Sequence, residues 1–388
     1  MSKGIETDVV IVGAGLVGLS AAVALADMGK HVTLVDAKQP DFSLSAEWDQ
    51  RIYALTPGNV QWLYGLGVWD AVDASRVNPI HSMRLWHDDA ALQLDSLDAH
   101  LADMGVIIEQ QNLMHAFGER LKSIGLKVLS GAVCSGIENT QKGISLLLKD
   151  GMHIDAQLLL GADSARSWVR DALGIDTRLH DFEQTAIVAN FKAEKPHQNA
   201  AYQWFRPHET LALLPMSNQH VSLVWAMSTQ LAQQKLMESA EVLAEEVGDV
   251  TGHLLGELTP VTAAAGFPLK QITASRFVAE RAVLLGDAAH QVHPMAGQGV
   301  NLGFRDVVEL ACRMQQAHAM MPMGDAQLLR RYERARKADV LGMNLLTSGL
   351  DALFATNYAS VKKLADWGFR QVGQREWLRK RLIQQAVI

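Results

Sequence analysis

The chain has 388 residues, 48% of them hydrophobic and 20% charged, and a formal net charge of −7 at pH 7. This composition excludes wholesale disorder, and the mildly acidic balance argues against a nucleic-acid binder. The two cysteines, Cys134 and Cys312, lie far apart in sequence, which excludes a disulfide framework and a cysteine-based zinc site and fits a reducing, cytoplasmic compartment. The length predicts two or three domains, or one large interwoven unit.

An uncharged run of 18 residues, 9–26, lies near the N-terminus and reaches the lower limit for a membrane span. The segment Ala24-Leu25-Ala26 also resembles a signal-peptide cleavage site. The flank carries Glu6 and Asp8, however, so it lacks the basic region of an export signal. Three glycines inside the run give it a third interpretation, which we favour.

These glycines stand between a short apolar strand and a helix, and a second apolar strand follows the helix. Residues 8–12 are β-branched, as in a buried parallel strand, and residues 19–28 are rich in small helix formers. A second apolar strand, 31–35, closes on Asp36. Strand, Gly-x-Gly-x-x-Gly, helix, strand and acidic residue together form the dinucleotide-binding fingerprint in its required context.

Each fingerprint residue has a physical reason. Gly13 permits the tight turn, Gly15 lets a pyrophosphate approach the backbone, and Gly18 lets helix and strand pack closely. Asp36 follows Gly13 by 23 residues, which suits an acceptor for a ribose hydroxyl. The alternative is a glycine-rich turn that binds nothing. The fingerprint does not separate FAD from NAD, but its place at the extreme N-terminus favours FAD.

Two charged residues in the middle of the chain have competing interpretations. Arg51 precedes a helix expected over 59–69, and is either a surface charge or a cation that reaches a phosphate or a flavin edge. Asp163 ends the apolar segment 158–162, where parallel sheets bind ligands. The serines that follow, Ser164 and Ser167, are candidate caps of a helix.

Residues 181–276 predict a second lobe built mainly of antiparallel strands. We expect strands over 186–192, 202–206, 211–214 and 220–227, with a hairpin turn at 217–219. Trp204, Phe205 and Trp225 lie on this sheet. Such aromatic residues are either core or the lining of a pocket for an aromatic substrate.

A second glycine-rich segment follows a buried strand that ends in Gly286-Asp287. A helix is expected to begin near Val300, and the glycines before it allow a flat ligand to approach the backbone. His290 and His293 are poor metal ligands, because Pro294 follows and no carboxylate stands at zincin spacing, so no metal site is expected. His290 is the nearest titratable side chain, and a structural role is favoured over an acid–base one. Neither a hydrolase elbow nor a P-loop pattern is present.

These motifs resemble the single-component FAD-dependent aromatic hydroxylases, the group of p-hydroxybenzoate hydroxylase. The fingerprint is the first family motif, residues 163–170 resemble the second, with Ser164 in place of Gly, and Gly286-Asp287 is the third. Within that group the chain resembles the ubiquinone-biosynthesis hydroxylases over nearly its whole length. The signature is Gly286-Asp287-Ala288-Ala289-His290 followed by Pro294-x-Ala296-Gly297-Gln298-Gly299-x-Asn301-Leu302-Gly303-x-Arg305-Asp306-Val307.

The resemblance implies an α/β fold. It consists of a Rossmann-like FAD-binding domain of segments 1–72, 101–180 and 277–340, an inserted antiparallel-sheet substrate domain of 73–100 and 181–276, and a helical C-terminal region of 341–388. It also implies the cofactor-binding residues. These are Gly13, Gly15 and Gly18 at the pyrophosphate, Asp36 at the ribose, Arg51 beside FAD, Asp163 in the second motif, Asp287 at the ribityl side, and Pro294, Gly297, Gln298, Gly299, Val300 and Asn301 along the flavin ring. No catalytic side chain is named.

The implied chemistry is a flavin monooxygenation. NADPH or NADH reduces FAD, O2 adds to give a C4a-hydroperoxyflavin, and an oxygen atom passes to a polyprenylated, membrane-soluble phenol. Other ubiquinone-biosynthesis enzymes are expected partners, and nucleic acid is not. Alternatives are the same chemistry on a small soluble phenol or aromatic acid, a flavin-bound scaffold subunit, and, more weakly, a reductase or halogenase. A cationic clamp in the pocket would favour the acid, and an apolar tunnel the prenyl tail.

The C-terminal residues 361–388 carry seven basic and two acidic side chains, a net charge of +5 against −12 for the rest. Trp367, Phe369 and Trp377 are interleaved with them. This pattern predicts either a peripheral contact with acidic lipid on the inner face of the membrane, a contact with partner enzymes, or a helix packed on its own domain.

Overall fold

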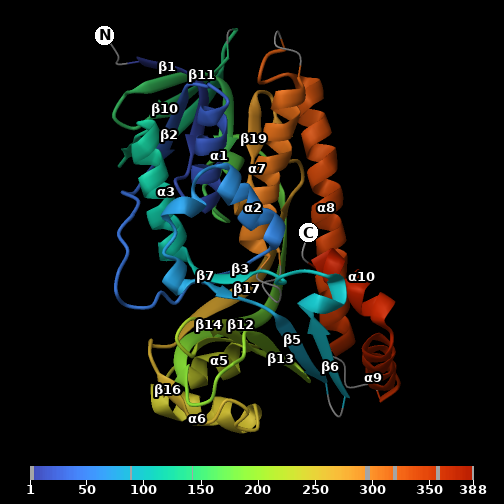
Figure 1. The fold of residues 1–388 in the computed structure, drawn as a ribbon. Coiled ribbons are helices and arrows are strands. Elements are labelled where there is room, and N and C mark those ends of the chain that lie inside the picture. Colours follow the sequence, from blue (N-terminus) through green and yellow to red (C-terminus); the bar gives the residue numbers. More distant parts are fainter. Residues whose placement is uncertain are drawn as a thin grey trace.

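The computed structural model describes residues 4–87, 90–141, 143–292, 298–317, 321–354 and 359–386. Within these residues one sheet of eight strands lies at the top of Figure 1. Its main path is β18 (Val278–Ala279), β19 (Ala282–Leu284), β11 (His153–Gly161), β1 (Gly4–Val12), β2 (Val32–Asp36) and β8 (Val128–Ser130), and β10 (Ile144–Leu148) and β9 (Cys134–Asn139) branch from β11. From β19 to β8 every neighbouring pair on this path is parallel.

Helices cover this sheet and explain its apolar strands. Val9, Val10 and Ile11 of β1 are fully buried, as expected for a parallel strand with both faces covered. The helix α1 (Leu16–Asp27) packs against both α3 (Gln110–Ile124) and α7 (Gly299–Gln316). The run 9–26 is therefore a strand, a turn and a helix. No helix of the described residues is long and apolar enough to cross a membrane.

A second sheet, of nine strands, lies at the bottom of Figure 1. Its order is β20 (His290–Gln291), β17 (Ala265–Ala274), β12 (Thr177–Ala193), β15 (His220–Ser228), β14 (Glu209–Met216), β13 (Ala200–Arg206), β5 (Ser82–His87) and β6 (Ala90–Asp95), with β16 (Leu258–Pro260) beside β12. All of its neighbouring pairs are antiparallel except β13 with β5. The predicted hairpin turn is present, and Asn218 and Gln219 in it have positive φ.

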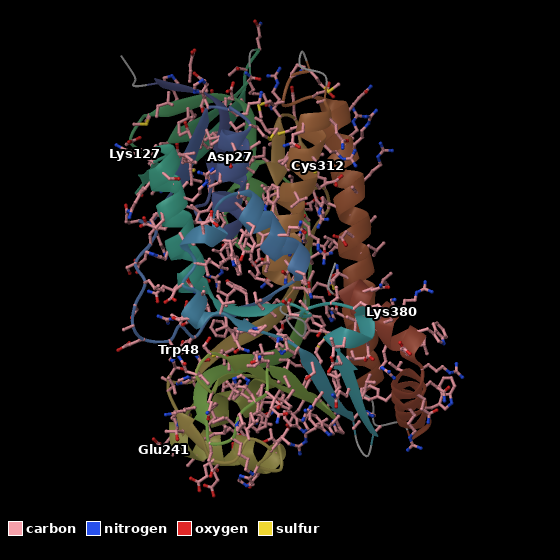
Figure 2. All side chains as sticks on the ribbon, viewed as in Figure 1. Asp27, Trp48, Lys127, Glu241, Cys312 and Lys380 are labelled. Atoms are coloured by element: carbon pink, nitrogen blue, oxygen red, sulfur yellow. The ribbon has the colours of Figure 1, made fainter. Side chains whose placement is uncertain are left out.

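A small third sheet joins the two large ones. It consists of β3 (Ile52–Leu55), β7 (Val106–Glu109) and β4 (Asn78–Pro79). Figure 1 shows β3 and β7 at the level where the upper and lower lobes meet, and Figure 2 labels Trp48 close to this level. The loop that leads into β3 is therefore placed between the lobes.

Seven further α-helices complete the described fold. They are α2 (Pro57–Gly65), α4 (Trp168–Ala172), α5 (Thr229–Lys235), α6 (Ala240–Val250), α8 (Ala326–Phe354), α9 (Ala359–Gln374) and α10 (Glu376–Ala386). The sheet pattern did not predict α5 and α6. Their amphipathic sequences begin at the side-chain caps Ser228 and Ser239, and they cover one face of the second sheet.

Candidate functional site

The predicted binding residues gather at one edge of the first sheet. Gly13 follows β1, Asp36 ends β2, Asp163 follows β11, and Gly286-Asp287 follow β19. These four strands are adjacent and parallel, so their carboxyl ends share one edge. This is the edge at which open α/β sheets bind ligands.

The three fingerprint glycines differ in their surroundings. A Cβ on Gly13, whose φ is +106°, would lie 2.3 Å from the carbonyl oxygen of Ala162, and one on Gly18 would lie 1.8 Å from the carbonyl oxygen of Gly13. At Gly15, by contrast, no described residue other than its two chain neighbours has an atom within 4 Å of that position. Gly13 and Gly18 are thus required by the fold, whereas Gly15 presents an open backbone surface at the N-terminus of α1. That surface fits a pyrophosphate.

Asp36 lies against this turn. Its Oδ2 accepts a hydrogen bond from the backbone N–H of Ala14 at 2.7 Å, and its Oδ1 accepts one from Lys38 at 2.8 Å. The carboxylate is therefore fixed beside the glycine turn, as a ribose acceptor would have to be.

The first and third motifs meet at Val17 in the first turn of α1. A Cβ on Gly286 would lie 3.1 Å from its side chain, and a Cβ on Gly303 of α7 would lie 2.5 Å from it. Asp287 lies at the start of α7, with its Oδ1 3.9 Å from the Cβ position of Gly299. The surrounding protein raises the pKa of Asp287 above its usual value by desolvation. The N-termini of α1 and α7 thus face one region of the molecule.

The Asn301 side chain has a structural role, separate from the place of its backbone that the resemblance implies. Its Oδ1 accepts hydrogen bonds from the Asn59 side chain at 2.8 Å and the Thr56 backbone at 3.1 Å, and its amide donates to the carbonyl of Ala54 at 2.8 Å. The side chain therefore fastens α7 to β3 and α2. Gln298 precedes α7, and its buried Oε1 has no hydrogen-bond partner among the described residues. Pro294, Gly297 and His293 lie outside the described residues.

Behind the Gly-Asp turn lies a buried charge network that the motifs did not predict. Asp306 accepts from Gly286 N–H at 2.7 Å and from Arg336 Nε at 2.6 Å, and Nε2 of His290 lies 2.7 Å from its Oδ2. Burial alone would raise the pKa of Asp306, but His290 and Arg336 hold it below its usual value. The position of His290 supports its structural interpretation. The available signal was the spacing of Leu302, Asp306 and Leu310, which puts an acid on the apolar face of a helix.

The second motif is brought against the first. Asp163 accepts from the hydroxyl of Ser167 at 2.5 Å and from the N–H of Val169 at 3.0 Å, and Ser167 caps α4. Burial raises the pKa of Asp163. Ser164 adopts a positive φ of 69°, a backbone conformation that favours the Gly that the family resemblance implies at this position.

Arg51 lies between the lobes. Its side chain is exposed, and its guanidinium carbon is 5.8 Å from the centre of the Phe267 ring on β17. Phe267 pairs with Ala186 of β12, so both side chains are on one face of the second sheet. That face is turned toward Arg51 and the edge of the first sheet.

A half-buried row of side chains crosses this face. Asn190 of β12 points to it, since its amide donates to the carbonyl of Asp49 at 2.8 Å, and Val188 is two residues away. The row consists of one residue from each of five neighbouring strands, and each residue is the pairing partner of the next. These residues are Val188, Val224, Ala212, Gln203 and Leu85, and all five are partly exposed. Four are apolar and none is charged.

Trp204 and Trp225 belong to the opposite face. Trp225 is 2% exposed in the cluster beneath α5 and α6, and Trp204 packs on the same cluster and stacks on Trp86 with ring centres 4.7 Å apart. They are core residues rather than pocket residues. Phe205 contacts Phe369 of α9, with ring centres 6.4 Å apart.

Comparisons with known proteins agree with this geometry. A family described as FAD binding domain matches residues 6–343. Ubiquinone hydroxylase UbiL of Rhodospirillum rubrum is 34% identical over 383 residues, covering 98% of this chain and 89% of that protein. The 3-demethoxyubiquinol 3-hydroxylase of Escherichia coli is 34% identical, covering 90% and 89%. In fold, p-nitrophenol 4-monooxygenase PnpA of Pseudomonas putida aligns with a TM-score of 0.80 at 18% identity, covering 99% and 98%.

Proposed function

The chain belongs to the FAD binding domain family, and we propose that it hydroxylates a polyprenylated phenolic ring in ubiquinone biosynthesis. FAD is the cofactor, NADPH or NADH the transient reductant, and O2 the co-substrate. When bound, FAD supplies the redox chemistry that activates O2. The names of the relatives support the pathway, and the half-buried row supports the substrate class.

The meeting of the glycine motifs carries the cofactor part of the proposal. Gly15 and the start of α1 offer N–H groups to the pyrophosphate, with Asp36 at the ribose. Asp287 and the backbone at residues 297–301 would hold the flavin side, with Arg51 and Asp163 nearby. The protein binds and orients the flavin and keeps water from the reacting ring. No acid or base side chain is assigned to the oxygen transfer.

The row on the second sheet carries the substrate part. Its side chains Val188, Val224, Ala212 and Leu85 are apolar, and Gln203 is the polar member. An aromatic acid would need a cationic partner there, because burying an unpaired carboxylate is costly. The row itself offers none, and Arg51, the cation toward which this face is turned, is assigned to FAD; the row therefore favours a prenylated phenol over an aromatic acid.

The test is substrate-stimulated oxidation of NADH and NADPH by the FAD-loaded protein under ¹⁸O₂. We expect a prenylated phenol to accelerate oxidation and to gain one labelled oxygen atom, while a hydroxybenzoate does neither. Stimulation by the hydroxybenzoate alone would transfer the chemistry to a soluble aromatic acid. Absence of turnover with FAD bound would favour a scaffold subunit. Deleting the gene should accumulate a prenylphenol one oxygen short.

We also propose that the C-terminal helices make the peripheral contact with acidic lipid. Trp367 on α9 and Trp377 on α10 are each 60% exposed, and the exposed Arg370, Arg375 and Arg381 lie among them. Lys380, on the same region, is labelled in Figure 2. Aromatic and basic side chains together suit an anionic lipid surface.

This contact is tested by sedimentation with vesicles of phosphatidylglycerol or of phosphatidylcholine. We expect binding to the anionic vesicles, weakened in a Trp377→Ser variant and by salt. A Lys127→Ser variant, which changes a basic residue on the upper lobe, is the matched control. Equal binding to both lipids would contradict the proposal. Binding to neither lipid would also contradict it, and would favour a contact with partner enzymes or helices that only pack on their own domain.

A further inference from the structure

The loop that carries Arg51 is held by a buried ion pair. Glu109, at the end of β7, is 1% exposed and accepts two hydrogen bonds from Arg76, each of 2.7 Å. The Arg76 guanidinium also donates to the carbonyls of Ser45 and Glu47, the latter at 2.8 Å, and lies 4.9 Å from the centre of the Trp48 ring. One guanidinium thereby fixes residues 45–48, which with 49–51 we term the Arg51 loop.

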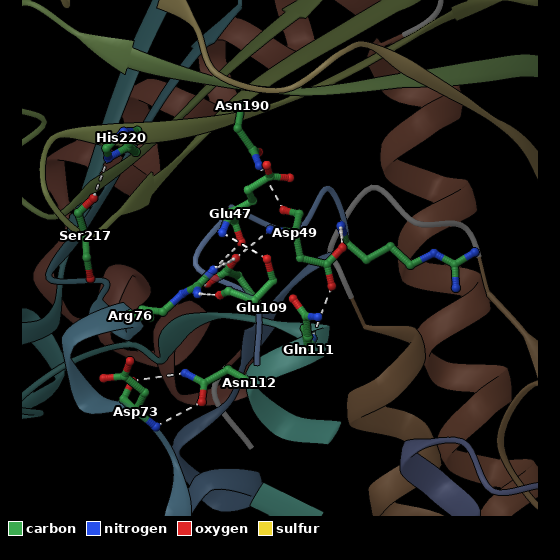
Figure 3. A network of polar contacts seen from close by, with 12 residues as sticks. Glu47, Asp49, Asp73, Arg76, Glu109, Gln111, Asn112, Asn190, Ser217 and His220 are labelled. Carbon is green, nitrogen blue, oxygen red and sulfur yellow. Dashed lines mark hydrogen bonds and ion pairs between the residues drawn. The ribbon is translucent and has the colours of Figure 1, made fainter. Parts of the chain in front are cut away.

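Asp49 continues this arrangement up to Arg51. Its N–H donates to Oε1 of Glu109 at 2.6 Å, so the carboxylate holds both Arg76 and the loop backbone. Its own carboxylate accepts from the N–H of Arg51 at 2.9 Å and from the N–H of Gln111 at 3.1 Å. Figure 3 shows Asp49, Glu109 and Arg76 in one connected network. The carboxylate of Asp49 thus holds the backbone N–H of Arg51, and the carboxylate of Glu109 holds the backbone N–H of Asp49.

The other side of the loop is attached to the second sheet. Asn190 donates to the carbonyl of Asp49 at 2.8 Å, and Gln50 donates to the carbonyl of Ala263 at 2.7 Å. The ring of Trp48 lies 5.0 Å from the ring of His220. In Figure 3 Asn190 approaches Asp49 from a strand of that sheet. The Arg51 loop therefore connects the second sheet to the backbone of Arg51.

We propose that Glu109, Arg76 and Asn190 are positioning residues that set the Arg51 guanidinium against the flavin, and that Asn190 transmits the position of the substrate sheet to it. The inference rests on the proposed function, because it requires Arg51 to contact FAD. A buried carboxylate with two bonds from a planar guanidinium fixes direction as well as distance, which a lysine could not reproduce. None of the three residues is expected to touch the reacting atoms.

The experiment measures FAD affinity and the visible circular dichroism of the bound flavin in the full-length protein. The single variants are Asn190→Ala, Glu109→Gln, Arg76→Met, Arg76→Lys and Arg51→Ala, and the double variant combines Arg51→Ala with Asn190→Ala. Asp27→Asn is the matched control, since it breaks a 2.7 Å ion pair with Arg120 on α3, at the other end of the upper lobe. Thermal unfolding of the FAD-free proteins reports any loss of folding.

We expect Asn190→Ala to weaken FAD binding about tenfold, the size of one lost hydrogen bond to the loop. Because it acts through Arg51, it should have no further effect in the Arg51→Ala background, and both variants should change the flavin dichroism in the same way. Glu109→Gln should also weaken FAD binding, provided that the variant folds. Arg76→Met should lower the FAD affinity, and Arg76→Lys should lower it by a similar factor, because a lysine cannot replace the paired bonds of the guanidinium.

Three results overturn the inference, and the first two concern the positioning residues alone. They are FAD affinities and spectra in Asn190→Ala equal to those of Asp27→Asn, or effects of Arg51→Ala and Asn190→Ala that multiply in the double variant. Wild-type affinity for FAD in Arg51→Ala would also overturn it, because the loop would then have nothing to position. Failure of the wild-type protein to bind FAD would refute the proposed function itself, so the two failures are distinguishable.

Discussion

Replacing Gly15 by alanine should separate cofactor binding from folding. In the FAD-free protein the added methyl meets no atom within 4 Å from any described residue other than its two chain neighbours, and the backbone, at φ −77° and ψ 178°, is one that alanine adopts. Alanine is a poorer helix N-cap than glycine, by about 0.5–1 kcal/mol. Alanine also has less conformational freedom than glycine in the unfolded chain, which stabilises the folded protein by about 0.4–1 kcal/mol. The net change in the free energy of unfolding should be close to zero.

The same methyl occupies the surface that the pyrophosphate needs. We expect FAD to bind about 10- to 100-fold more weakly, which is about 1.4–2.8 kcal/mol. Gly18→Ala is the contrasting variant. Its Cβ would lie 1.8 Å from a backbone oxygen that cannot rotate away, so the cost should exceed the about 1–3 kcal/mol of ordinary overpacking.

The assay is urea unfolding of the FAD-free proteins together with fluorescence titration of FAD. Gly15→Ala should unfold at the wild-type urea concentration and bind FAD weakly, while Gly18→Ala should fail in both measurements. A Gly15→Ala protein that loses more than about 2 kcal/mol of stability, or that binds FAD as tightly as wild type, would refute the assignment of this surface to the pyrophosphate.

Three further outcomes are expected. Asp287→Asn should raise the thermal midpoint of the FAD-free protein, because desolvation raises the pKa of that carboxyl and makes its charged form destabilising at neutral pH, while FAD affinity falls; calorimetry with and without FAD checks both. Arg336→Met should cost about 3–5 kcal/mol in urea unfolding, since it leaves the buried Asp306 carboxylate without its guanidinium partner. The hydrogen bond from Arg379 of α10 lowers the pKa of Asp98 in the folded protein. The stabilisation from this ion pair is therefore fully present above the unfolded pKa of about 4, and it is lost as the pH falls through the lower pKa of the folded protein. Limited proteolysis near α10 should rise in that window, and already at pH 7 in Asp98→Asn; no difference between the two proteins would contradict it.

Local sequence patterns predicted the parts of the site that depend on backbone conformation. The turn at Gly13, the strand that closes on Asp36 and the start of α7 follow from glycine spacing and apolar runs, and each is present. The strands β13, β14 and β15 extend the predicted ones by one or more residues, because pairing continues beyond the apolar core of each strand.

Partners remote in sequence could not be predicted in this way. Glu109 and Arg76 are 33 residues apart and Asn190 lies 141 residues from Asp49, with no periodicity to connect them. The resemblance implies that the backbone of Asn301 lies along the flavin ring, but it does not predict the partners of its side chain, which bonds to β3 and to the residue before α2. The face of Trp204 was undetermined until the pairing register was known, since a shift of one residue exchanges the two faces of a strand.

The strand order of the first sheet also has a consequence for synthesis of the protein. β1 and its neighbour β2 are complete at Asp36, but β11, on the other side of β1, begins only at His153, and β19, beside β11, begins at Ala282. At about 5–20 residues per second, β1 and the apolar start of α1 wait roughly 7–30 s for β11, and longer for β19. The growing chain must keep residues 9–26 from aggregating during that time, and Gly303, which packs against Val17, emerges later still. FAD therefore meets a complete site only after residue 303 has been made.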